Sequence, residues 1–399
     1  MDYREIAFKL IKSKYDVSKD LVVKGLFGDY LKKLKTQYGA FCVFGAGSLG
    51  IDMIDLIKSF GLEVDYVCDN NYEQIRNRFS ENPQPICFDD LCKIKDKCLV
   101  FVSPSNGPVK ANTAINLQLQ KSNFDHVIST PIWKNMVYLL REIGEVDKEY
   151  FLDRVMQIID WCEDDFSKRV FTAVLEQLFC DYRTVNIVNN IEEYYDPHQY
   201  FTDFVGKRSD ECFVDCGAFV GDTFELFYQW SGGEYEKYYG FELDPKNLKR
   251  LRSNIYQIEK NHSRIELFGC GLHDKNEKMK AYLRNDTSYV MGTNSIGYDA
   301  SEIVELKTLD DCLEGRKVTF LKMDIENSEI PALYGARKII TEQKPLCAIS
   351  NYHGLKQLIE VPAILKSMNP EYRIRLRAHS TVGHDIVCYA MDQEDNRNM

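Results

Sequence analysis

The sequence predicts an α/β protein with two Rossmann-like units, a smaller one in residues 1–130 and a larger one with a seven-stranded sheet in residues 206–399. A helical connector is predicted at residues 131–205. Three observations predict this fold. Each unit opens with a short apolar strand, a glycine loop and an amphipathic helix. A second strand then ends on an acidic residue about 20 positions after the loop, as in nucleotide-binding βαβ units. Strands and helices alternate through the rest of each unit.

The smaller unit begins with helical spacing up to residue 37, and its first strand is predicted at residues 41–44. The loop that follows has Gly-x-Gly-x-x-Gly spacing, and the next strand, residues 63–68, ends on an Asp-Asn pair. This pattern predicts a bound nucleotide, contacted by Gly45, Gly47, Ser48, Leu49, Gly50, Asp69 and Asn70. The alternative is a scaffold in which the glycines only make the turn. Further elements are predicted as strands at residues 86–91, 98–103 and 126–129 and a helix at 109–121.

The connector contains aromatic-rich helical runs at residues 150–161 and 167–180 and no persistent strand pattern. We expect it to close over one or both sheets.

The larger unit opens with an apolar strand that ends in Asp215, followed by a turn made by Gly217 and Gly221. The next strand, residues 238–241, stops on Glu242, whose carboxylate can accept hydrogen bonds from both hydroxyls of a ribose. A carboxylate that opens the loop would repel a pyrophosphate. It suits the amino group of S-adenosylmethionine, directly or through water.

The remaining strands of the larger unit complete a mostly parallel sheet with a closing antiparallel hairpin. They are predicted at residues 264–268, 318–324, 346–350, 372–377 and 386–391. A polar and aromatic insertion at residues 283–301 interrupts the alternation, and we expect it to contact the substrate.

The composition limits the classes of partner. The 399 residues carry a formal net charge of −11, and no run of lysine and arginine is available to neutralise phosphates, so no nucleic-acid partner is expected. The 13 cysteines form no Cys-x-x-Cys pair, which favours reduced thiols in the cytosol. We find no signal peptide and no apolar run of about 18 residues, so we expect a cytoplasmic protein without a membrane span. The sequence does not indicate the oligomeric state.

Several separated motifs of the larger unit resemble the FkbM family of S-adenosylmethionine-dependent methyltransferases. They are the segments 213–223, 240–247, 308–312, 320–329, 348–353 and 387–390. The resemblance implies a class I methyltransferase domain whose cofactor is contacted by Asp215, Gly217, Ala218, Phe219, Gly221, Asp222, Thr223, Glu242, Leu243, Gly271 and Leu272. Two departures stand out: Asn327-Ser328 replace the usual Gly-Ala of the family, and Leu243 replaces a proline.

The smaller unit resembles, more weakly, the nucleotide-sugar-binding domain that precedes some bacterial sugar acetyltransferases. FkbM-like enzymes of glycan and capsule gene clusters can carry such a domain. This resemblance implies a carbohydrate acceptor.

Methyl transfer to a hydroxyl requires an aligned nucleophile and a group that helps to remove its proton. The candidates are Asp324, Glu326 and His353, which follow predicted strands at the edge where α/β sheets bind ligands. His353 has the ordinary pKa that best suits a base near neutral pH. The alternatives are that Asp324 caps a helix, that Glu326 complements its dipole, and that His353 is a structural loop residue. His379 and His384, beside the last hairpin turn, are weaker candidates. Asp324 and Glu326 could also orient His353, bind sugar hydroxyls or hold a divalent cation, but a metal site is the less favoured alternative because the spacing fixes no geometry, so none is predicted.

The sequence therefore favours an O-methyltransferase that uses S-adenosylmethionine and acts on a hydroxyl of a small-molecule or glycan acceptor, of the capsule, polysaccharide or nucleotide-sugar type. One alternative is an NAD-dependent nucleotide-sugar oxidoreductase or epimerase that uses the first glycine loop. Another is a non-catalytic nucleotide-sugar binder.

Overall fold

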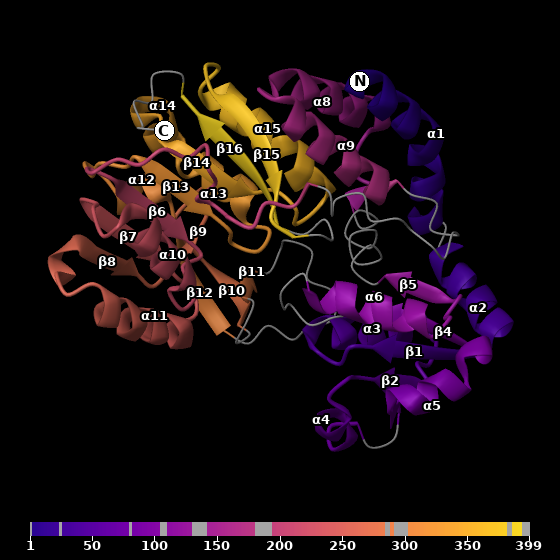
Figure 1. The fold of residues 1–399 in the computed structure, drawn as a ribbon. Helices are drawn as coiled ribbons and strands as arrows, with labels where there is room; N and C mark the ends of the chain where they lie inside the picture. The colour runs from indigo at the N-terminus through magenta and orange to yellow at the C-terminus, as the bar shows by residue number, and fades with distance from the viewer. Residues whose placement is uncertain are drawn as a thin grey trace.

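The structure is a computed structural model, and Figure 1 shows that it has a small α/β lobe and a larger one. It describes residues 2–23, 26–79, 82–103, 110–129, 142–179, 194–283, 288–290, 302–380 and 385–392. No helix in these ranges is both long and apolar enough to cross a membrane.

The small lobe is a five-stranded parallel sheet with helices on both faces. Its strand order is β3-β2-β1-β4-β5, and β1 and β4 are continuous apolar runs because both of their faces are buried. The strands are β1 (Ala40–Phe44), β2 (Tyr66–Cys68), β3 (Gln84–Ile86), β4 (Cys98–Val102) and β5 (Val127–Ser129). Helices α2 (Leu26–Tyr38) and α3 (Ser48–Ser59) pack on one face, and α5 (Phe88–Lys93) and α6 (Lys110–Lys121) pack on the other. Two short helices, α4 (Tyr72–Arg76) and η1 (Lys95–Lys97), lie in the connections.

The predicted strand at residues 86–91 is wrong. Strand β3 ends at Ile86 and helix α5 begins at Phe88. Asp89 and Asp90 lie in the first turn of this helix, where carboxylates interact favourably with the helix dipole. These two acidic residues favour a helix over the apolar run that suggested a strand.

Helix α1 (Tyr3–Val23) packs into the core of the large lobe, although it was predicted as part of the unit at residues 1–130. Tyr3, Ala7, Ile11 and Tyr15 form one buried stripe at helical spacing. The stripe belongs to the hydrophobic core of the large lobe, and the Tyr15 hydroxyl donates a hydrogen bond to the Val146 carbonyl at 2.8 Å. Helix α1 therefore joins the connector helices α8 (Lys148–Trp161) and α9 (Asp165–Leu178), as Figure 1 shows.

The large lobe contains the predicted seven-stranded sheet, with the order β15-β16-β14-β13-β6-β7-β8. Strand β16 runs antiparallel to both of its neighbours, and the other pairings are parallel. The predicted fold class is thus confirmed. The strands are β6 (Cys212–Cys216), β7 (Lys237–Phe241), β8 (Ile265–Phe268), β13 (Phe320–Met323), β14 (Leu346–Ser350), β15 (Arg373–Ala378) and β16 (Ile386–Met391).

Alternation along these strands divides the core between the two faces of the sheet. On β6, Phe213 packs with helices α10 (Asp222–Ser231) and α11 (Pro245–Ile258), whereas Val214 packs toward the opposite side. That opposite side is covered by α13 (Glu329–Tyr334), α14 (Arg337–Gln343), α15 (Leu355–Met368) and the α1, α8 and α9 group. The sheet is therefore buried on both faces, which leaves the ends of its strands for ligands.

After β8 the chain forms a four-stranded sheet, which the sequence did not predict. Its order is β11-β10-β12-β9, with β9 (Gly271–Leu272), β10 (Glu277–Leu283), β11 (Ser288–Val290) and β12 (Glu302–Lys307). Apart from Leu283 and β11, the predicted insertion at residues 283–301 lies outside the described residues. In β10, charged residues alternate with apolar ones, because only one face of this strand packs on apolar side chains. In the sequence, this pattern is hard to distinguish from that of a solvent-exposed loop. The short helices η3 (His262–Arg264) and α12 (Leu309–Cys312) complete the lobe.

Candidate active site

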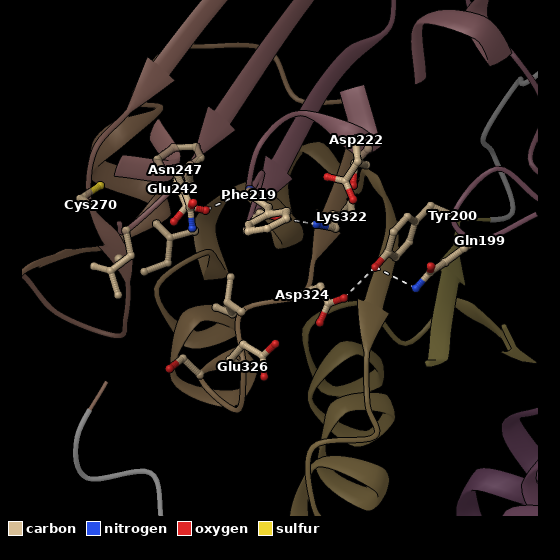
Figure 2. A pocket seen from close by; sticks show the side chains of 18 of the residues that line it. Gln199, Tyr200, Phe219, Asp222, Glu242, Asn247, Cys270, Lys322, Asp324 and Glu326 are labelled. Atoms are coloured by element: carbon tan, nitrogen blue, oxygen red, sulfur yellow. Dashed lines mark hydrogen bonds between the residues drawn. The ribbon is translucent and has the colours of Figure 1, made fainter. Parts of the chain in front are cut away.

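A cavity of about 260 Å³ lies at the carboxyl ends of β6, β7 and β13. Figure 2 shows its two ends. We call one the glutamate end, lined by Glu242, Leu243, Asn247 and Cys270, and the other the tyrosine end, lined by Tyr200, Lys322, Asp324 and Glu326. The glycine loop after β6 lies between them.

The glycine loop is shaped by close contacts that only glycine tolerates. Gly217 has a φ of +83°, and a Cβ atom at this position would lie 1.9 Å from the carbonyl oxygen of Asp324. The amides of Gly217 and Ala218 both donate to the Phe241 carbonyl, at 3.0 and 2.9 Å. The loop is thereby fixed between β7 and the end of β13.

Asp215 does not line the cavity, and its predicted contact with a ligand amino group, directly or through water, stays a prediction. Its carboxylate is completely buried, accepts a hydrogen bond from the Tyr238 hydroxyl at 2.8 Å, and pairs with the Lys322 ammonium at 2.9 Å. The Lys322 ammonium also donates to the Gly217 carbonyl at 2.9 Å. Asp215 therefore positions Lys322, and Lys322 positions the loop that faces the cavity.

Glu242 is held by two backbone amides in the glutamate end. Phe219 N–H donates to one carboxylate oxygen at 2.9 Å, and Asp244 N–H donates to the other at 2.8 Å. Burial raises the pKa of Glu242 to about 7, although these two amides oppose the shift. Each oxygen keeps a further lone pair, so the fixed carboxylate can accept hydrogen bonds from two neighbouring hydroxyls.

The structure brings most of the predicted cofactor residues to this cavity. Those that line it are Gly217, Phe219, Asp222, Thr223, Glu242, Leu243, Gly271 and Leu272. Ala218 and Gly221 lie outside its lining because they are packed within the turn, with Gly221 preceding α10 at a φ of +94°. Sequence reasoning missed Asn247 and Leu226, which line the cavity from helices α11 and α10 and whose spacing carries no signal of binding.

At the tyrosine end, Asp324 is oriented by two tyrosines. The Tyr200 hydroxyl donates to one of its oxygens at 2.9 Å, and the Tyr352 hydroxyl donates to the other at 3.4 Å. Helix α13 has Ser328 at its N-cap, so Asp324 is not the cap of this helix. Tyr200 was missed because a tyrosine in an irregular segment before β6 has no periodicity to mark it.

His353 lies behind the cavity and is surrounded by carboxylates. Its Nδ1 is 3.0 Å from Glu329 Oε1, and its Nε2 is 3.8 Å from Asp324 Oδ1 and 3.6 Å from Glu326 Oε2. Burial lowers the pKa of His353, but the three carboxylates outweigh it and raise the pKa to about 10. An imidazole that carries both protons at neutral pH cannot act as a base, so the predicted role of His353 does not fit this geometry.

The other predicted histidines do not contribute to the cavity lining. His379 is fixed between the Asp196 carbonyl and the Tyr389 hydroxyl, each at 2.8 Å, and burial lowers its pKa to about 4. His384 lies outside the described residues. His379 is therefore a structural group between the chain segment before β6 and strand β16.

In the small lobe, the predicted nucleotide residues close their own turn. The Asp69 carboxylate accepts hydrogen bonds from the Ala46 and Asn71 amides, both at 2.9 Å. A Cβ atom at Gly50 would lie 1.9 Å from the Gly45 carbonyl oxygen, so this glycine is required by packing. Asn70 exchanges hydrogen bonds with Gln118 at 3.1 and 3.2 Å. A nucleotide bound by Gly45, Gly47, Ser48, Leu49, Gly50, Asp69 and Asn70 stays a prediction.

Comparisons with known proteins agree with the fold. The family profile described as Methyltransferase FkbM domain matches residues 215–372. The crystal structure of methyltransferase FkbM from Methylobacillus flagellatus KT has a TM-score of 0.66 and 21% identity, and the match covers 96% of this chain and 100% of that one. No curated protein matches the chain.

Two more distant structures match about half of the chain. A putative rRNA-methylase from Clostridium thermocellum has a TM-score of 0.30 and 12% identity, over 51% of this chain and 92% of that one. A SAM dependent methyltransferase from Aquifex aeolicus has a TM-score of 0.30 and 13% identity, over 52% of this chain and 95% of that one. The resemblance of the larger unit to FkbM methyltransferases is thus confirmed for residues 215–372.

The buried ion pair predicts a large effect on stability. Lys322→Met should lower the free energy of unfolding by about 3–5 kcal/mol, because it leaves the Asp215 charge buried without a partner. The double variant Asp215→Asn with Lys322→Met should recover much of that loss. Urea denaturation followed by circular dichroism measures both.

Lys317→Met is the matched control for this experiment. Lys317 pairs with Asp210 and Glu236 on the surface, so its loss should cost about 1 kcal/mol or less. Equal losses for the Lys322 and Lys317 variants would contradict a structural role for the buried pair.

Proposed function

We propose that this chain, in which residues 215–372 form a methyltransferase FkbM domain, transfers a methyl group from S-adenosylmethionine to a hydroxyl of a carbohydrate. One observation carries the proposal. A single cavity joins a buried carboxylate suited to a ribose, Glu242, to a hydroxyl-compatible end around Asp324.

The residues of the glutamate end and the glycine loop fit an adenosyl cofactor. Glu242 would accept hydrogen bonds from the ribose hydroxyls, and Leu243 and Leu272 would contact the adenine with their apolar side chains. Asp222, an exposed carboxylate on the cavity wall, would face the methionine amino group in place of the buried Asp215. When bound, S-adenosylmethionine supplies the methyl group, which is attached to a positively charged sulfur that serves as the leaving group of an in-line displacement.

The tyrosine end supports a sugar hydroxyl as the acceptor. Its lining is rich in oxygen and amide groups, contributed by Gln199, Asp324, Glu326, Ser328 and Asp385. These groups accept hydrogen bonds from hydroxyls, and the carboxylates among them would repel a phosphate. Asp324, oriented by Tyr200, would accept a hydrogen bond from the reacting hydroxyl and so favour the loss of its proton.

The cofactor contact predicts a pH dependence of binding. Because burial raises the pKa of Glu242 to about 7, this group is protonated below that pH and loses acceptor capacity. The affinity for S-adenosylhomocysteine should therefore fall as the pH is lowered from 8 to 6. Glu242→Gln should weaken binding at pH 8 by several-fold to about a hundredfold and should flatten the pH profile. Isothermal titration calorimetry provides both measurements.

Glu225→Gln, on the exposed face of α10, is the control variant and should bind as the wild type does. Affinity that is independent of pH in the wild type, or unchanged in Glu242→Gln, would sink the proposed ribose contact. Binding of NAD without S-adenosylhomocysteine would instead favour an oxidoreductase.

Transfer itself is tested with methyl-labelled S-adenosylmethionine and a panel of free sugars, oligosaccharides and nucleotide sugars. The expected product is a base-stable methyl ether. Asp324→Asn should lower kcat by about 100-fold or more while leaving the affinity for S-adenosylhomocysteine within about threefold of the wild type. Label that appears on an amine, or as a base-labile ester, would show that the acceptor is not a hydroxyl.

A further inference from the structure

We propose that the tyrosine end of the cavity holds a divalent cation, with His353 Nε2, Asp324 Oδ1 and Glu326 Oε2 as its ligands. The inference rests on the proposed methyl transfer for its chemical role but not for its existence. In the sequence such a site is only a less favoured alternative, because spacing alone fixes no geometry.

The first argument is the position of His353 Nε2. His353 is 9% exposed, and Nε2 has no hydrogen-bond partner among the residues described. It lies 3.8 Å from Asp324 Oδ1 and 3.6 Å from Glu326 Oε2. These distances are too long for hydrogen bonds, but two atoms about 2.1 Å from one cation lie roughly 3.0–3.6 Å apart. Both distances from Nε2 are close to this spacing, and a movement of Glu326, whose side chain is 36% exposed, would bring its oxygen to the same ion as Asp324 Oδ1.

The second argument is the group behind the histidine. Glu329 Oε1 lies 3.0 Å from His353 Nδ1, on the side of the ring away from Nε2. Glu329 is completely buried and is fixed by the Ile325 amide at 2.9 Å and by the Gln357 side chain at 3.0 Å. A histidine that ligates a metal commonly donates its other ring N–H to such a carboxylate. Glu329 is close enough to favour the proton on Nδ1, although neither ring nitrogen makes a hydrogen bond within the described residues. A cation would displace the proton from Nε2 and bind the lone pair that this proton occupied.

The third argument is charge. Asp324, Glu326 and Glu329 place three carboxylates around one imidazole. Lys322 lines the same cavity, but its ammonium is paired with Asp215. Like charges this close in a half-buried site repel one another, and a divalent cation would offset that repulsion.

The ligand set and the open cavity point to Mn²⁺ or Mg²⁺. Two carboxylates and one imidazole leave coordination positions for water and for an acceptor oxygen. The imidazole ligand favours Mn²⁺ over Mg²⁺. A cation here would bind the acceptor hydroxyl and lower its pKa. The hydroxyl proton passes to water, the new O–CH₃ bond forms, the S–CH₃ bond breaks, and the sulfonium becomes a neutral thioether. Asp324 then acts through Oδ1 as a ligand, while its other oxygen stays with Tyr200.

Direct titration tests the site without any assay of activity. The full chain is treated with EDTA, dialysed and titrated with Mn²⁺, and free Mn²⁺ is followed by electron paramagnetic resonance. The wild type should bind one Mn²⁺ per chain. Glu326→Gln and His353→Ala should weaken binding at least tenfold, and Glu329→Gln should weaken it about 10–100-fold through the orientation of His353. Melting temperatures establish that each variant is folded, and Glu326→Gln, at a partly exposed side chain, keeps the test valid if His353→Ala does not fold.

A second acidic cluster supplies the matched control. His273, Asp274 and Glu277 also lie close enough together to hold a cation, in a more exposed position. His273→Ala should leave the binding of Mn²⁺ unchanged. The proposal is overturned if the wild type binds no Mn²⁺, if the Glu326 and His353 variants bind as the wild type does, or if only His273→Ala loses binding.

Methyl transfer after EDTA treatment separates this inference from the proposed function. Restoration of transfer by Mn²⁺ supports both. Full transfer by EDTA-treated protein that binds no Mn²⁺ overturns the cation site and leaves the methyltransferase proposal standing. Binding of Mn²⁺ that depends on His353, in a protein that methylates no sugar, overturns the carbohydrate proposal and leaves the site standing.

Discussion

The ion pair between Lys322 and Asp215 is the interaction on which the geometry of the cavity depends. It links β13 to β6 in the centre of the sheet, and Tyr238 on β7 holds the same carboxylate. Both charges are almost completely removed from water, so each requires the other. The free donor capacity of Lys322 then fixes the Gly217 carbonyl and with it the loop along the cavity. The strand-end aspartate thus acts on the ligand site through a lysine.

Lys322 is paired with Asp215, and the other charged residues that line the cavity in the described part of the chain are acidic. Asp222, Glu242, Asp324 and Glu326 all line it. Such a surface attracts a positively charged sulfonium and disfavours a pyrophosphate. The charge distribution therefore favours S-adenosylmethionine over a dinucleotide, and it does so through the acidic residues of the lining, which do not include the aspartate that opens the loop.

Sequence patterns predicted the strands and turns that depend on neighbouring residues. They missed contacts between side chains on different elements of the fold. Most strands of the two parallel sheets, the turn at Gly217 and the position of Glu242 at a strand end follow from apolar runs and residue spacing. His353 and Glu329 lie on different elements, and their contact raises the pKa of a histidine that appeared suited to act as a base. Tyr200 precedes β6 in an irregular segment, so its contact with Asp324 depends on the folded sheet. Neither contact arises from a repeating pattern of residues, so the sequence alone does not reveal it.

Helix α1 shows the same limit at the level of domains. Its buried stripe, from Tyr3 to Tyr15, has the spacing of any amphipathic helix, and the spacing does not identify the partner. In the structure the partner is the large lobe, while the next helix, α2, packs on the small sheet. The first helix therefore belongs to the core of the large lobe and the second to the core of the small lobe. The first helix is thus part of the structure that supports the sheet of the active site, even though it is far from that sheet in the sequence.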